Sequence, residues 1–98
     1  MNIYEKMNAT VSYYKDTVKP YLKEAERDTW FYLYTDEQLD DFHTDIANYR
    51  QPLEQVEDEL LALCEQEEEK EMVDTFYLSI ILPMIEEIDR VDKLIDEQ

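Results

Sequence analysis

The residues of this 98-residue chain that could do chemistry are few and lie far apart in the sequence. His43 is the only histidine, and it follows Asp40 by three residues. In ferritin-like bundles that spacing lets a carboxylate and an imidazole share a metal, but such sites need two motifs of this kind and two further inward-facing glutamates. The chain supplies one motif, so we expect His43 to be a surface or boundary residue and no metal to be bound.

Cys64 is the only cysteine, which excludes an internal disulfide and fits a reducing compartment. It follows Leu60 and Leu63 and has no partner at metal-ligand spacing, so we expect a buried, small apolar residue. Glu65 and Glu67 beside it would raise rather than lower the pKa of its thiol. With no nucleophile–base arrangement and no glycine-centred calcium loop, the sequence predicts a non-enzymatic protein without a cofactor.

The chain contains no glycine, although 44% of its residues are hydrophobic and 12% aromatic. Hairpin turns and phosphate-binding loops usually need glycine, so its absence argues against β structure and nucleotide-binding motifs. The composition favours helix formers and is apolar enough for a packed core. We therefore predict an all-α fold in one domain, 1–98, and a cytoplasmic protein, since no segment resembles a signal peptide or a membrane span.

Apolar residues recur at intervals of three and four, the period of an amphipathic helix. The first stripe comprises Ile3, Met7, Val11, Tyr14, Val18, Leu22 and Ala25. The last comprises Val73, Phe76, Tyr77, Ile80, Met84, Ile88, Val91 and Ile95. Because proline removes a helical hydrogen bond, we expect Pro20 to kink the first helix or divide it near Lys19, and Pro83 to kink the last helix.

Two further helices are predicted between these stripes. Thr35 and Gln38 have the spacing of a capping box, so a helix should begin there and place Leu39, Phe42, Ile46 and Tyr49 inward. Pro52 should end it near 49–51 and begin a third helix. That helix places Leu53, Val56, Leu60, Leu63 and Cys64 on its apolar side. The expected architecture is a small antiparallel bundle of three or four helices.

Two apolar regions have two interpretations each. The aromatic run 30–34 either closes one end of the bundle or anchors a partner. The last helix is apolar around much of its circumference between Phe76 and Ile85, so it is either the central helix or one face of a homodimer.

The formal net charge is −17, and the excess is confined to one part of the chain. Bases slightly outnumber acids from Met1 to Arg27, whereas from Asp28 onward 22 acids face four bases. Such self-repulsion costs stability. This charge distribution also differs from that of a merely soluble helix surface, which would show mixed glutamate–lysine pairs. We therefore expect a strongly basic partner surface.

Acidic side chains on a helix can imitate a phosphate backbone, because neighbours at i and i+4 lie about 5–6 Å apart and duplex DNA has about one charge per 1.7 Å. The sequence thus predicts an inhibitor that mimics nucleic acid and fills the basic surface of a DNA- or RNA-binding protein, without binding nucleic acid or membrane itself. The residues expected at that interface are Glu57, Asp58, Glu65, Glu67, Glu68, Glu69 and Glu71, then Asp36, Asp40 and Asp41.

In size, charge and lack of glycine motifs, the chain resembles small phage-encoded inhibitors of restriction, CRISPR or host transcription proteins. This resemblance is a charge profile shared by unrelated folds and assigns no residue a role. The alternatives are an immunity or antitoxin-type protein that neutralises a basic toxin or nuclease, and a structural helical assembly protein. The abundant tyrosines suit the immunity or antitoxin class, since aromatic hot spots among acids are typical of such interfaces.

Overall fold

The computed structural model describes residues 2–29 and 33–97, and it is helical along most of this length. No strand occurs within the described residues, so the predicted all-α class is confirmed. The helical elements in chain order are α1 (Ile3–Tyr13), a π-helical turn (Tyr14–Val18), α2 (Lys19–Asp28), α3 (Asp36–Leu63), α4 (Glu67–Phe76), a second π-helical turn (Tyr77–Ile81) and α5 (Leu82–Asp96).

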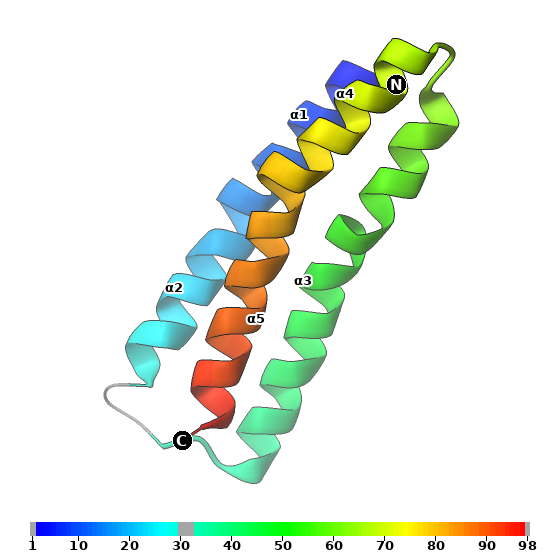
Figure 1. Ribbon diagram of the computed structural model, residues 1–98. Coiled ribbons are helices and arrows are strands. Elements are labelled where there is room, and N and C mark those ends of the chain that lie inside the picture. Colours follow the sequence, from blue (N-terminus) through cyan, green and yellow to red (C-terminus); the bar gives the residue numbers. More distant parts are fainter. Residues whose placement is uncertain (1, 30–32, 98) are drawn as a thin grey trace.

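These elements form three long segments that lie side by side (Figure 1). The first runs from α1 through α2, the second is α3, and the third runs from α4 through α5. The chain reverses direction at each connection, and the whole molecule measures 50 × 20 × 18 Å. The start of α1 lies at the same end as the α3–α4 connection, where Ile3 and Tyr4 line a shallow hollow with Leu63 and Glu65.

The helical path continues through Pro20 and Pro83, each of which follows a π-helical turn by two residues. In these turns the N–H of Lys19 donates to the carbonyl of Tyr14, and that of Leu82 to the carbonyl of Tyr77. A proline ring clashes with the carbonyl four residues earlier in a regular helix. A π-helical turn is wider, because its hydrogen bonds join residues i and i+5, and this changes the position of the carbonyls relative to the proline ring. The helix therefore continues where the sequence suggested a division.

The second π-helical turn also shifts which residues of the third segment are buried. The sequence predicted Ile80 and Met84 on the inner face, but Ile80 is 39% exposed while Ile81 is fully buried. Ile85 is likewise buried, and Met84 only partly. Phe76 and Ile81 are five residues apart, and this extra residue rotates the apolar stripe. The prediction was wrong here because it assumed one helical period throughout.

The predicted end of a helix near 49–51 is also wrong, since α3 continues through Pro52 to Leu63. Leu53 and Val56 are buried in the same core as Phe42 and Ile46, so their packing stabilises the helix on both sides of the proline. The Tyr13 hydroxyl of α1 donates to the carbonyl of Tyr49, 3.3 Å away in the turn before Pro52. The capping box predicted for Thr35 and Gln38 is present, with both of its hydrogen bonds.

Replacing Pro52 by alanine is expected to stabilise the fold by about 1–3 kcal/mol, because it restores the missing helical hydrogen bond at an exposed position. Urea unfolding followed by circular dichroism measures the change. Gln51→Ala, a neighbouring exposed substitution, should leave the midpoint nearly unchanged. A lower midpoint for the Pro52 variant would show that α3 is built around the proline.

One continuous hydrophobic core joins the three segments, and its members come from all of them. The predicted inner residues Val18, Leu22, Ile88, Val91 and Ile95 are all buried. Of the aromatic run, residues 30–32 lie outside the described part of the chain. Leu33 is 83% exposed, whereas the hydroxyl of Tyr34 donates to the carbonyl of Ala25 at 3.4 Å. None of the described helices is long and apolar enough to cross a membrane.

Candidate functional site

The ten acids predicted from the sequence do not form one cluster in the structure. Seven lie in the last third of α3, the α3–α4 connection and the first turns of α4, and are called the α3–α4 acids: Glu57, Asp58, Glu65, Glu67, Glu68, Glu69 and Glu71. The other three, Asp36, Asp40 and Asp41, lie in the first two turns of α3. A 28-residue helix is about 40 Å long, so the two groups occupy opposite ends of the molecule.

Most of these acids are exposed and have no cation beside them. Eight are exposed, and only Glu57 and Glu69 are half-buried. Within the described residues only Glu67 forms an ion pair, with Lys70 at 3.4 Å. The carboxylate of Glu69 accepts the backbone N–H of Glu65 at 3.3 Å, which holds the connection against α4. Nine of the ten acids therefore have no ion-pair partner within the described residues, and seven of these nine are exposed.

Three of the bases, in contrast, join neighbouring helices. Lys6 of α1 pairs with Glu59 of α3 at 2.5 Å, and Arg50 of α3 pairs with Asp89 of α5. Arg90 of α5 contacts Glu26 of α2 through two hydrogen bonds of 2.9 and 3.1 Å. Each pair of neighbouring segments thus has its own ionic contact. The sequence did not reveal this use of the bases, because all three contacts join residues far apart in the chain.

Arg90 also bonds Glu87, and its hydrogen bonds hold the pKa values of Glu26 and Glu87 below the ordinary value of 4.5. A carboxyl with a lowered folded-state pKa stabilises the fold above its unfolded pKa, and this contribution is lost as the pH falls through the folded value. We expect Arg90→Gln to lower the urea midpoint at pH 7 and to have less effect at a pH well below 4.5. Lys93→Gln, on the same helix beside the exposed Glu97, is the matched control. An equal Arg90 effect at both pH values would contradict this assignment.

His43 lies between α3 and α5, with each ring nitrogen facing a different carboxylate. Nδ1 is 2.9 Å from Asp92 and Nε2 is 2.7 Å from Asp96. These donor atoms all lie within 4.8 Å of one another. One metal ion can bind only one nitrogen of an imidazole, so two carboxylates on two nitrogens fit an interhelical ion pair better than a metal centre. Asp40, the nearby acid in the sequence, is exposed and instead accepts the hydroxyl of Thr44 through its carbonyl.

Cys64 is half-buried at the end of α3, and its thiol donates to the carbonyl of Leu60 at 3.3 Å. Burial, and after it the negative charge of Glu69, raises the pKa of the thiol above its ordinary value. The direction agrees with the expectation from the sequence. A raised pKa leaves little thiolate, which fits a packing role rather than a nucleophilic one.

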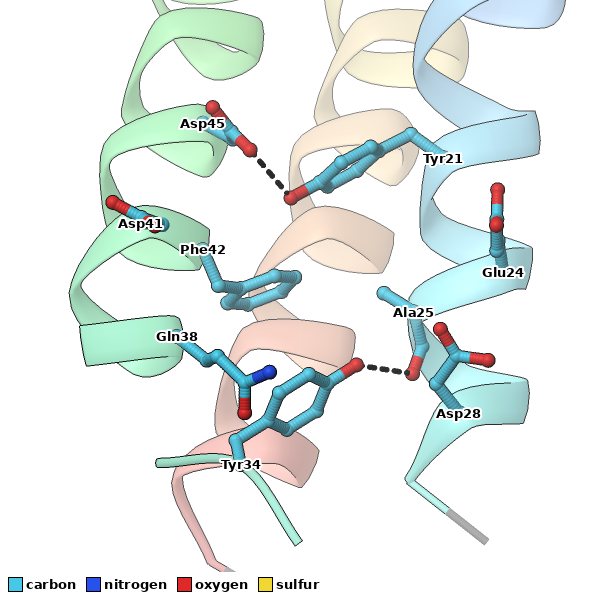
Figure 2. A pocket seen from close by; sticks show the side chains of 9 residues that line it. All are labelled: Tyr21, Glu24, Ala25, Asp28, Tyr34, Gln38, Asp41, Phe42 and Asp45. Atoms are coloured by element: carbon cyan, nitrogen blue, oxygen red, sulfur yellow. Dashed lines mark hydrogen bonds between the residues drawn. The ribbon is translucent and has the colours of Figure 1, made fainter. Parts of the chain in front are cut away.

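A second acidic feature, not predicted from the sequence, is a cleft of about 320 Å³ between the end of α2 and the start of α3 (Figure 2). We call it the aromatic cleft. Its floor contains the rings of Tyr21, Phe42 and Tyr34, and Figure 2 shows these rings between the two helices. Carboxylates lie on both sides: Glu24 and Asp28 from α2, Asp41 and Asp45 from α3.

The rings of the aromatic cleft are held in place by direct contacts. Tyr21 is nearly parallel to Phe42, with ring centroids 6.0 Å apart and planes 13° apart, and it contacts Tyr49 at 4.9 Å. Its hydroxyl donates to Asp45 at 2.9 Å. Tyr34 closes the cleft and is held to α2 by its bond to Ala25. Side chains anchored at both ends in this way form a cleft that exists before any ligand arrives.

The electrostatic environment of the aromatic cleft is negative. Burial, followed by the hydrogen bond to Asp45, raises the pKa of Tyr21 well above its usual range. Burial, followed by the charges of Asp28 and Glu24, raises the pKa of Tyr34. No lysine, arginine or histidine is among the described residues that line the cleft. Among the described residues only Asp28 of its four acids pairs with a base, Arg27, at 3.8 Å.

Of the cleft residues, sequence reasoning selected only Asp41. Glu24 and Asp28 were overlooked because each follows a base in the sequence, Lys23 and Arg27. Glu24–Asp28 and Asp41–Asp45 nevertheless each have the i,i+4 spacing of a shared helix face. Those two pairs were the available signal. These pairs alone do not show that α2 and α3 lie side by side.

Comparison with known proteins adds no assignment to this geometry. No family model matches the chain, and no curated protein or solved structure is significantly similar to it.

Proposed function

We propose that this protein is a non-enzymatic inhibitor that mimics nucleic acid and occupies the basic surface of a DNA- or RNA-binding protein. The observation that supports this most directly is the state of the ten predicted acids. Nine of them have no ion-pair partner within the described residues, while bases from each segment are used to hold the helices together. The fold thus separates its charges into ion pairs between helices and a group of exposed carboxylates that have no ion-pair partner among the described residues.

The shape of the molecule agrees with this function. A rod 50 Å long and 18–20 Å wide has about the thickness of a nucleic-acid duplex. A groove lined with lysine and arginine could receive the rod lengthwise and release its bound anions, as it releases ions on binding DNA. The proposal takes the three segments to form an antiparallel bundle in solution, with Pro20 and Pro83 bending the rod to fit its target.

Affinity capture tests the proposal when the protein is used as bait in a nuclease-treated lysate of its source cells. Mass spectrometry should identify a nucleic-acid-binding protein that an excess of polynucleotide elutes. A bait with Asp58, Glu65, Glu68 and Glu71 changed to lysine is the control, and it should not retain that protein. A partner retained equally by both baits and resistant to polynucleotide would contradict mimicry.

The second candidate is an immunity or antitoxin-type protein. It is favoured by the hollow at the end of the rod, where Tyr4 is 60% and Leu63 39% exposed beside Glu65 and Glu69. Apolar anchors among acids are typical of interfaces with basic proteins in general. In the capture experiment this function would appear as a toxin or nuclease that the polynucleotide does not displace.

A further inference from the structure

We infer that the aromatic cleft is a receptor for one arginine side chain of a basic protein partner. The inference deepens the proposed function and rests on its claim that the partner is a basic protein. It adds a specific contact, an arginine side chain in the aromatic cleft, to a surface that otherwise attracts the partner by net charge alone.

The first argument is the combination of flat rings and carboxylates in one concavity. A guanidinium is planar, stacks on aromatic faces and donates in pairs to carboxylates. Tyr21, Phe42 and Tyr34 supply the rings, and Glu24 and Asp28 supply acceptors on one side of them (Figure 2). An acidic patch on a convex helix surface would offer the charge without the rings.

The second argument is charge complementarity. The described residues that line the cleft include four carboxylates and no cation, and of these acids only Asp28 pairs with a base, Arg27, at 3.8 Å. A group with one positive charge would therefore enter a strongly negative site. The volume of about 320 Å³ lies at the lower limit of ligand pockets, which suits one side chain and not a folded segment. Arginine is also more weakly hydrated than lysine, so it loses less on leaving water for a partly buried site.

Two hydrogen bonds hold the rings of the aromatic cleft in place. The hydrogen bonds from Tyr21 to Asp45 and from Tyr34 to Ala25 fix the rings from opposite helices. Little conformational entropy is then lost when a side chain enters. The carboxylates of Glu24 and Asp28 do not take part in these two bonds. Glu24 has no ion-pair partner within the described residues, and Asp28 has only the 3.8 Å pair with the exposed Arg27, which a guanidinium would have to displace.

The test is an NMR titration of the ¹⁵N-labelled protein with Nα-acetyl-arginine amide, a capped arginine. We expect saturable, millimolar binding whose shifts concentrate on the amides of Tyr21, Tyr34 and Phe42. The capped citrulline amide has the same shape without charge, and the capped lysine amide has the charge without the plane. Both should bind at least severalfold more weakly. Equal binding of citrulline, or shifts spread over all acidic residues, would overturn the inference.

Two double variants that lose the same charge at different ends of the rod distinguish binding in the cleft from attraction by net charge. Glu24→Gln combined with Asp28→Asn should weaken arginine binding about tenfold or more. Glu65→Gln combined with Glu68→Gln removes the same charge at the other end of the rod and should change it little. An equal loss in both variants would show attraction by net charge and refute the cleft. Because the probe is a capped amino acid, this result is independent of whether polynucleotide competes with the protein's partner.

Discussion

Changing Asp58, Glu65, Glu68 and Glu71 to lysine is expected to abolish binding of the partner while the helical fold is retained. These four α3–α4 acids are exposed and have no ion-pair partner within the described residues, so the folded state has no contact that depends on their charge. Each reversal removes one ion-releasing contact and adds one repulsion. Because such contacts add in their effect on binding, four reversals reduce affinity by several orders of magnitude.

The same number of reversals at the other end of the rod tests the second group of the predicted interface. Asp36, Glu37, Asp40 and Asp41 lie in the first two turns of α3, where acids favour the helix dipole, so their reversal also costs some helix stability. Circular dichroism should show helical spectra for both. Isothermal titration with the captured partner should show binding lost in the first variant and weakened in the second, because both groups belong to the predicted interface. Unchanged binding in the first variant would exclude the α3–α4 acids as the interface.

Replacing Ile81 by alanine is expected to lower the free energy of unfolding by about 2–5 kcal/mol, a large fraction of the stability of a domain of this size. Ile81 is fully buried, so its truncation leaves a cavity among the three segments. The matched variant is Ile80→Ala, one residue earlier and 39% exposed, which should cost far less. Urea unfolding followed by circular dichroism measures both.

This pair of variants tests the second π-helical turn directly. A regular helix with the period predicted from the sequence would bury Ile80 and expose Ile81, so the two costs would be reversed. Reversed costs would therefore contradict the turn at Tyr77–Ile81.

The sequence predicted the helical class and most of the core from periodicity and the absence of glycine. The capping box at Thr35 was predictable because both of its partners lie within four residues. The end of a helix at Pro52 was not correct, because burial of Leu53 and Val56 outweighs the lost hydrogen bond. Helix propensities give the free-energy cost of a proline within a helix, but they do not include the tertiary packing that offsets this cost.

The candidate site was predictable only in part. Exposure of the acids follows from the apolar stripes, since a residue between stripes faces solvent. Their division into two groups follows from the uninterrupted length of α3, which the prediction of a break at Pro52 concealed. The aromatic cleft needs Tyr21 and Phe42 from two helices to meet, and the order of residues in the chain does not specify that contact.

The central claim is that the protein and nucleic acid compete for one surface. Fluorescence anisotropy of a labelled polynucleotide, bound to the captured partner and titrated with the protein, measures this most directly. The account predicts full displacement, with no ternary complex at any concentration, and a competition constant that weakens steeply with salt. A ternary complex in which the partner holds both the protein and the polynucleotide would contradict it.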